Sequence, residues 1–223
     1  MQEKSEKEKD LLQKNKTRAT IFLIGILLIS VVLFLISIPM GIRFGEYDPQ
    51  ETIDQLAGVD AVLVAVYALL NLVWSVIRIV FIVFFFIWLY RAYAHLQEQH
   101  VTGLAHTPRW AIGWYFIPVM NLYKPFSVMR ELTLASFHAV SNPDHWKLKK
   151  APAYIIVWWL LFLGGNIAFL FDLLIDYEAI GDYRRDALIG LFAHPMYVGA
   201  LLALYVIMKN ITQTQTQTIN KES

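Results

Sequence analysis

The chain has 223 residues, of which 57% are hydrophobic, 14% are aromatic and only 17% are charged. This balance leaves too little polar surface to coat a soluble globule of that size, so we assign the chain to the integral membrane class. The net charge of +1 hides a segregation of charge into blocks, and the absence of cysteine excludes disulfides, thiolate metal ligands and cysteine nucleophiles.

Four long apolar runs follow one another along the chain, and each predicts a membrane-spanning helix. They cover residues 19–42, 61–90, 151–175 and 187–208, and a helix needs about 20 residues to cross the hydrocarbon core. We interpret them as helices because only helices and closed barrels satisfy the backbone in lipid, and the runs do not alternate as strands do.

The polar segments around these runs complete the expected domain organisation. Residues 1–18 form a charged arm of alternating sign, either a solvated helix or a disordered segment. Residues 19–210 form a single four-helix transmembrane domain that includes an amphipathic loop at residues 91–150. Residues 211–223 contain the polar low-complexity stretch TQTQTQTINKES, and we expect this tail to be disordered.

Basic residues predict the orientation of the chain. Six precede the first run, one lies at 43–60, seven lie at 91–150, two lie at 176–186 and two follow the last run. Because lysine and arginine concentrate on the cytoplasmic side, both termini and the loop 91–150 are predicted to be cytoplasmic. The expected fold is an all-α integral membrane protein with four transmembrane helices and a cytoplasmic interfacial helical hairpin between the second and third.

The hairpin prediction rests on the stretch TPRWAIGWYFIPVMNLYKPF at residues 107–126. Its uncharged run, residues 110–123, has only 14 residues and is too short to cross a bilayer, and its richness in aromatic residues favours a position in the lipid interface. Pro118 breaks the helix, and Pro125 fits the first turn of the next one. The alternative is that both pieces pack on the transmembrane bundle. The residues expected at the interface are Arg109, Trp110, Trp114, Phe116 and Lys124.

Three segments of the sequence resemble a bacterial membrane family, the domain of unknown function 4328. They are WLYRAYAHL, TPRWAIGWYFIPVMNLYKPFSVMREL and IIVWW, and the resemblance covers roughly residues 60–210. It implies a multi-pass protein of the bacterial cytoplasmic (inner) membrane and brings no activity, substrate or cofactor with it. The residues that match the motif of the family are Trp88, Arg91, Pro108, Trp110, Pro118, Asn121 and Pro125.

Polar residues inside the apolar runs are candidates for function, because they are costly in lipid. Arg78, Asn166 and His194 each lie about 20 to 22 Å from the cytoplasmic end of their helix, which predicts one polar layer. Asp172 lies about 9 Å further along its helix, within reach of an arginine that extends outward. Either Arg78 pairs with Asp172 or Asp176 and fixes the bundle, or the layer is a substrate or ion site.

The stretch AHPMYVG near the end of the chain resembles the RHPxYxG element of membrane-embedded S-adenosylmethionine-dependent methyltransferases. Ala193 stands where those enzymes have arginine, and the polar tail has no counterpart of their acidic cofactor-binding segment. The alternative is a proline-kinked helix with a neutral, buried His194.

We therefore predict a non-enzymatic membrane component that is structural or binds a partner or lipid. The alternative is a small transporter or channel subunit with an intramembrane polar site, and the third candidate is a methyltransferase. No P-loop, dinucleotide fingerprint, zinc-protease motif or GxSxG elbow is present, and we expect neither a metal nor a cofactor. The expected partners are anionic membrane lipids and a protein partner or a second copy of the chain. The basic residues at 91–150 are too dilute for nucleic acid.

Overall fold

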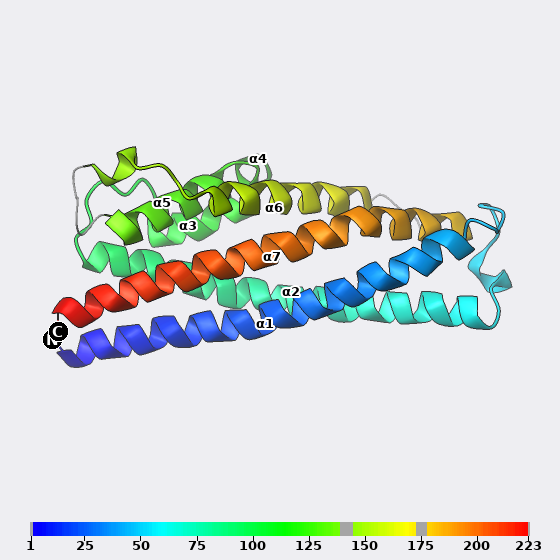
Figure 1. The fold of residues 1–223 in the computed structure, drawn as a ribbon, viewed down its shortest axis with the longest axis horizontal. Helices are drawn as coiled ribbons and strands as arrows, with labels where there is room; N and C mark the ends of the chain where they lie inside the picture. The colour runs from blue at the N-terminus through cyan, green and yellow to red at the C-terminus, as the bar shows by residue number, and fades with distance from the viewer. Residues whose placement is uncertain (1, 139–144, 173–177, 223) are drawn as a thin grey trace. The chain divides into compact units, whose positions relative to one another are not determined.

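The computed structural model describes the backbone of residues 2–138, 145–172 and 178–222, and Figure 1 shows these elements in chain order. Within these ranges every named element is helical and none is a strand. The elements are α1 (Gln2–Arg43), η1 (Ile53–Gln55), α2 (Val59–Glu98), α3 (Pro108–Gly113), η2 (Trp114–Phe116), α4 (Pro118–Asn121), α5 (Lys124–His138), η3 (Trp146–Leu148), α6 (Ala153–Asp172) and α7 (Ile180–Glu222).

Three helices are long and apolar enough to cross a membrane, which confirms the all-helical, membrane-type fold. They are the segments Lys9–Arg43, Val59–Glu98 and Ile180–Thr218. The helix α6 has 20 residues, and its fully described apolar part, Ala153–Ala168, is shorter than those three segments. A span requires about 20 residues, so the fourth span stays a prediction.

The helices divide between two compact units. The first unit comprises residues 1–23, 80–159 and 202–223, and the second comprises residues 24–79 and 160–201. The long helices α1, α2, α6 and α7 each contribute residues to both, whereas α3, α4 and α5 belong wholly to the first.

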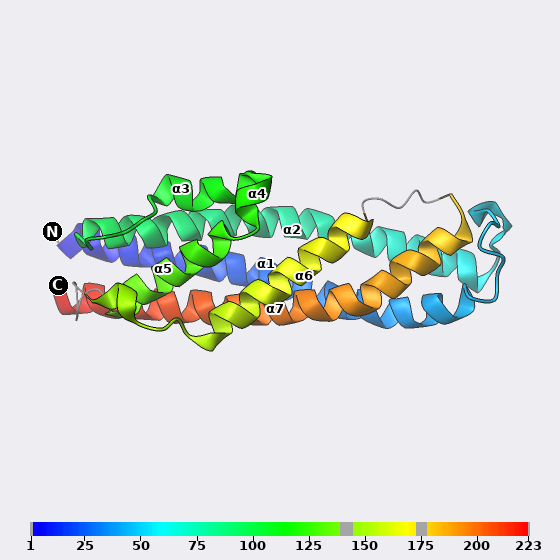
Figure 2. The ribbon, with the colours of Figure 1, turned by 90° about the horizontal axis from the view of Figure 1, so that it is seen from above.

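In the first unit, the end of α7 packs against α5 and α2, as Figure 2 shows for α5 and α7. The side-chain amide of Gln215 donates to the carbonyl of Ala92 at 3.1 Å and to the hydroxyl of Ser136 at 2.9 Å. The indole of Trp88 donates to Thr212 at 3.0 Å. The prediction of a disordered tail is therefore wrong, because its threonine and glutamine side chains find buried hydrogen-bond partners along a continuing helix.

The predicted amphipathic loop at residues 91–150 contributes helices to the core of the first unit. Its first eight residues continue α2 to Glu98, and α5 contributes to the core of the first unit. Met129 and Leu132 of α5 are completely buried. The two parts of the predicted hairpin therefore differ in burial. The helix α5 is a core helix, and only the part that contains α3 and α4 is largely exposed.

In the second unit, the connection that follows α1 contacts the first residues of α7 through its backbone. The N–H of Ile180 donates to the carbonyl of Glu51 at 2.8 Å, and the N–H of Gly181 donates to the carbonyl of Pro49 at 3.3 Å. A Cβ atom at Gly181 would lie 2.8 Å from that Pro49 oxygen. Glycine is therefore required at this close approach.

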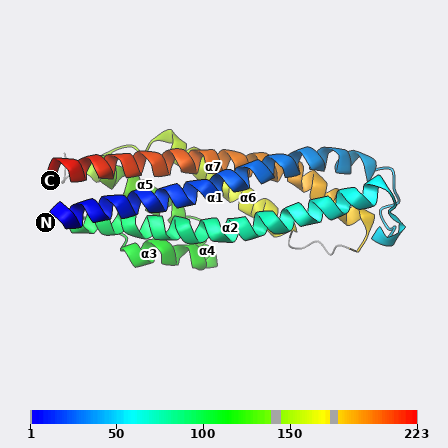
Figure 3. The same cartoon turned by 90° about the horizontal axis from the view of Figure 1, so that it is seen from below.

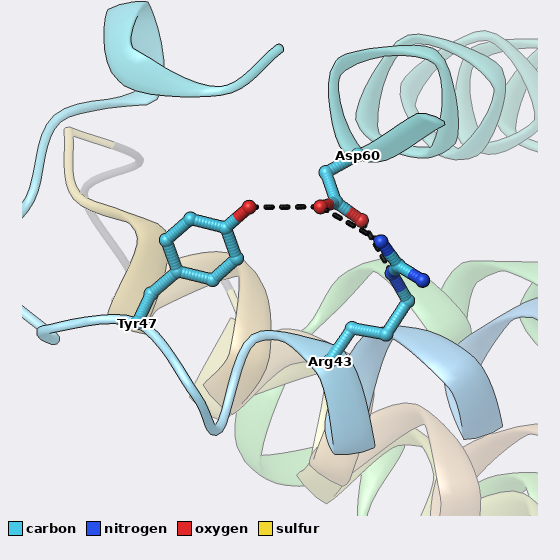
Figure 4. A network of polar contacts seen from close by, with 3 residues as sticks. All are labelled: Arg43, Tyr47 and Asp60. Atoms are coloured by element: carbon cyan, nitrogen blue, oxygen red, sulfur yellow. Dashed lines mark hydrogen bonds and ion pairs between the residues drawn. The ribbon is translucent and has the colours of Figure 1, made fainter. Parts of the chain in front are cut away.

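The end of α1 is tied to the start of α2 by a carboxylate that accepts three hydrogen bonds (Figure 4). The guanidinium of Arg43 donates to both oxygens of Asp60, one of them at 3.0 Å, and the hydroxyl of Tyr47 donates to Asp60 at 2.8 Å. This hydrogen bond raises the pKa of Tyr47. The side chain of Asp60 is only 8% exposed, so its charge depends on these partners.

Candidate functional site

The first candidate site is the aromatic segment, which we define as residues 107–124 with α3, η2 and α4. Thr107 begins it as an N-cap whose hydroxyl accepts the backbone N–H of Trp110 at 3.3 Å, and Pro108 occupies the first turn. Ile117 is extended, and Pro118 then starts α4. The helix break predicted at Pro118 is therefore present.

The aromatic segment packs against the part of α2 that belongs to the same unit. The ring of Tyr115 lies 5.2 Å from that of Phe86 and 6.0 Å from that of Phe85, and Phe116 lies 5.5 Å from Phe86. Burial raises the pKa of Tyr115. In Figures 2 and 3, α3 and α4 accordingly lie along α2. The predicted alternative of packing on the helices thus describes one face of the segment.

The other face of the segment is exposed and apolar. Phe116 is 71% exposed and Trp110 is 52% exposed. Further exposed residues on the segment are Ile117, Val119, Leu122 and Tyr123. The neighbouring part of α2 also exposes Val83 and Ile87. Large exposed apolar patches often mark sites of interaction with lipid or protein, so this face is a candidate binding surface.

Two cations border this apolar face. The ammonium of Lys124 lies 4.8 Å from the centre of the Trp114 ring and 5.6 Å from that of Tyr123. Arg109 is exposed at the other end of the segment. The five residues predicted at the interface therefore all belong to one local structure, in which Trp114 is half-buried and the other aromatic residues are more exposed.

A buried glutamate and a buried histidine anchor the segment to the core. Neither was predicted as a site residue. The carboxylate of Glu131 accepts the backbone N–H groups of Ala105 at 2.8 Å and His106 at 3.1 Å, and the hydroxyl of Tyr93 at 3.4 Å. The ring of His106 contacts the hydroxyl of Ser127 at 3.2 Å. Burial lowers the pKa of His106, and Lys124 lowers it further, whereas Glu131 raises it.

The sequence offered one signal for this anchor, a single glutamate that follows Arg130 in the middle of the predicted helix after Pro125. Glu131 and His106 are 25 residues apart, and no spacing rule joins them. Their contact depends on how the chain turns between α2 and α3, where His100 and Gly103 adopt positive φ angles.

The motif residues of the family have clear structural positions in the first unit. Trp88 is completely buried, Arg91 is half-buried on α2, and Pro125 is buried at the second position of α5. Asn121 is half-buried, and its backbone N–H closes the short turn α4 by donating to Ile117 at 2.8 Å.

The second candidate site consists of the polar residues of the second unit. The guanidinium of Arg78 lies over the rings of Trp74 at 5.0 Å and Tyr197 at 5.6 Å. Asn166 donates to the carbonyl of Phe162 at 2.7 Å, within its own helix. The predicted partner of Arg78, the side chain of Asp172, and the whole of Asp176 lie outside the described residues, so this pairing stays a prediction.

His194 lines a cavity of about 50 Å³ between α2, α6 and α7 in the second unit. The polar and aromatic residues around it are Tyr67, Asn71, Trp74, Asp186, His194 and Tyr197. Of these residues, only His194 was predicted as a site residue. Asp186 lies just before the last apolar run and looks like a loop residue, and Asn71 is a single amide inside a long apolar run.

Metal binding finds no support in these side chains. Among the described residues, no group of three or more histidines and carboxylates is arranged so that it could hold a metal ion. The cavity has room for a few water molecules, since each needs about 10 to 15 Å³ of such volume.

These features define a class, that of helical membrane proteins, with an exposed aromatic segment and a small polar cavity within the helices. The chain belongs to the family described as Domain of unknown function (DUF4328), whose model matches residues 52–213. This range includes the whole aromatic segment and every residue that lines the cavity. The resemblance to this family is confirmed. No curated protein and no solved structure matches the chain.

Proposed function

We propose that the protein is a non-enzymatic membrane component that binds anionic lipid through the aromatic segment. The observation that carries this proposal is the exposed apolar face of a segment whose other face is fixed to α2. Fully burying an aromatic or large aliphatic side chain stabilises by about 1.5 to 3 kcal/mol. The exposed residues of the segment therefore supply a strong driving force for contact with acyl chains.

The charges at the border of the segment support anionic rather than neutral lipid. Arg109 and Lys124 each add about 1 kcal/mol near an anionic surface. This contribution is smaller than that of apolar burial, so charge selects the headgroup while the aromatic residues supply most of the affinity. The stacking of Lys124 on Trp114 places its ammonium beside the apolar face.

The membrane topology belongs to the same proposal. Here α6 is the fourth span, the aromatic segment and both termini are cytoplasmic, and the protein is a multi-pass protein of the bacterial inner membrane. The support is the distribution of basic residues, with seven at 91–150 and one at 43–60. A protein partner or a second copy of the chain that shares the interface is compatible with this arrangement.

Spin labels on the full-length chain test the lipid contact, since the chain has no native cysteine. Val119→Cys places a label on the exposed face of the segment, Leu72→Cys on the exposed apolar face of α2, and Gln97→Cys on an exposed polar position. In nanodiscs, the label at Val119 should collide more with oxygen than with a water-soluble nickel chelate, as the label at Leu72 does. A collision ratio equal to that at Gln97 contradicts the proposal.

Headgroup selection has its own measurement. The double variant Arg109→Gln with Lys124→Gln should reduce the preference for spin-labelled phosphatidylglycerol over phosphatidylcholine. The matched control is Lys7→Gln with Lys14→Gln, which removes the same charge from α1 and should leave the preference unchanged. An equal loss in both double variants means that net charge alone, and not the aromatic segment, selects the lipid.

A small transporter or channel subunit is the second candidate, and the polar cavity of the second unit favours it. A carboxylate and an imidazole among apolar helices cost free energy, so both are candidates for a functional role. The lipid contact and the cavity lie in different units, so each can be tested without the other.

A further inference from the structure

The cavity of the second unit is suited to water. It measures about 50 Å³ and is lined by the carboxylate of Asp186, the imidazole of His194 and the amide of Asn71. A buried water molecule needs two to four polar partners, and these groups supply acceptors and donors around the space. The cavity therefore has the volume and the polar partners that a small cluster of water molecules requires.

One face of α7 supplies both ionisable groups. Asp186, Gly190 and His194 follow one another at intervals of four residues, so they lie along one side of the helix. Asp186 and His194 are then about 12 Å apart along the axis. Gly190 keeps the space between them open, because a Cβ atom there would lie 2.9 Å from the hydroxyl of Ser37 and 3.2 Å from Nε2 of His194.

The facing helix α2 supplies groups that can order water between the two. The phenol of Tyr67 interacts with Asp186, Asn71 and Ser37. Asn71 donates its side-chain N–H to the carbonyl of Tyr67 at 3.1 Å. Its side-chain oxygen is then available to accept a hydrogen bond from a water molecule.

A fixed aromatic pair lies between the cavity and a permanent cation. Trp74 and Tyr197 meet edge to face at 5.4 Å, and each donates a hydrogen bond at 2.9 Å, Trp74 to Ser30 and Tyr197 to the carbonyl of Gly165. Both rings line the cavity, and both carry the guanidinium of Arg78 on their faces. A guanidinium charge at this point disfavours every additional cation in the cavity, so a proton that binds there must be held by a basic group, the carboxylate or the imidazole.

We propose that this cavity is a hydrated proton-binding site in which Asp186 and His194 are the acceptors. A proton enters on a hydronium ion, binds a carboxylate oxygen of Asp186 or a ring nitrogen of His194, and leaves one water molecule behind. Among the described side chains, the other titratable or charged groups near the site are Tyr67 and Arg78 of α2 and Tyr197 of α7, together with Tyr183, which interacts with Asp186. α1 and α6 contribute the uncharged Ser37 and Ala168.

Access of water to the cavity is the first test. Ala168→Cys places a thiol in the cavity wall, whereas Ile167→Cys places one on the exposed apolar face of the same helix. In nanodiscs, a small water-soluble methanethiosulfonate should react faster with the cysteine at 168, because only a hydrated thiol ionises. Adding Gly190→Ala should slow this reaction by filling the space. Equal rates at 167 and 168 overturn the proposal.

Proton binding is the second test, made by NMR on full-length protein with labelled imidazoles. The resonance that His194→Gln removes should titrate reversibly, and Asp186→Asn should shift its midpoint to lower pH by removing a nearby negative charge. His145, which is exposed, is the control and should not respond to Asp186→Asn. An imidazole at 194 that does not titrate between about pH 4 and 9, a range that brackets the ordinary histidine pKa, overturns the proposal. So does a midpoint that is indifferent to Asp186.

Discussion

The indole N–H of Trp114 donates a hydrogen bond to Nδ1 of His106 at 3.2 Å. Because an indole nitrogen only donates, Nδ1 carries no proton, and the ring proton lies on Nε2, which faces Ser127 at 3.2 Å. The neutral ring of His106 thus joins the aromatic segment to α5. The exposed residues on either side of Trp114 are held by this one contact and by the packing of Tyr115.

Replacement of Trp114 by phenylalanine tests the strength of that anchor. The ring is retained in part, but the hydrogen bond to His106 is lost, so the free energy of unfolding should fall by about 1 kcal/mol. Thermal or denaturant unfolding in detergent measures this loss. The matched control is Trp110→Phe, at an exposed position, where the change should stay within about 0.5 kcal/mol. Equal losses at the two positions mean that the hydrogen bond does not anchor the segment.

The same ring predicts a dependence of stability on pH. Burial lowers the pKa of His106 below the ordinary value, which is about 6.5. Between the two values the unfolded chain binds more protons than the folded chain, so stability is complete above about pH 6.5 and falls as the pH decreases through that window. Protonation also puts a hydrogen on Nδ1, against the indole donor.

Unfolding midpoints recorded between about pH 7.5 and 5, on either side of the histidine pKa, measure this effect. The midpoint of the wild-type chain should fall more steeply with acid than that of His106→Gln, which cannot be protonated. His145→Gln removes an exposed histidine and should retain the wild-type slope. If His106→Gln shows the wild-type slope as well, another group is responsible for the acid sensitivity.

The Arg43–Asp60 pair predicts a coupling between the ends of α1 and α2. Asp60→Asn and Arg43→Gln should each lower the unfolding midpoint, and the double variant should lose less than the sum of the two, because a single change leaves the other partner uncompensated. Asp54→Asn, an exposed carboxylate in η1, is the control for charge and should show no coupling to Arg43→Gln. Strict additivity for Asp60 indicates that the ion pair contributes no coupling.

Single cysteines test the topology, and the structure decides where they can be placed. Gln50, Gln97 and Glu178 are exposed and do not depend on glycine geometry. Gly181 is unsuitable because of its contact with Pro49, and Gly103 because its φ angle is +80°. An impermeant maleimide added to intact cells should label positions 50 and 178, and position 97 only after lysis. Labelling of position 97 from outside contradicts the proposed orientation.

The long helices could be predicted from the sequence because apolar length alone distinguishes spanning segments from the rest. The break at Pro118 and the start of α5 near Pro125 followed from the missing proline N–H. In both cases the signal is local, since apolar length and a missing backbone N–H can be recognised without knowing the tertiary structure.

The polar layer could be predicted only in part, because counting residues gives depth along a helix and not the direction in which a side chain points. Arg78 and His194 both lie near Trp74 and Tyr197. Asn166 lies at a similar depth but bonds to its own helix. Asp186 was missed because a carboxylate near a basic pair looks like a loop residue until the helix that contains it is known.

The Thr-Gln tract at the end of α7 is uniform in sequence and specific in its contacts, since Thr212 accepts from Trp88 and Gln215 donates to Ala92 and Ser136. Removing one Thr-Gln dipeptide from the tract shifts every later residue by two positions and still leaves threonine at 212 and glutamine at 215. Both contacts are therefore preserved when the repeat contracts by one unit.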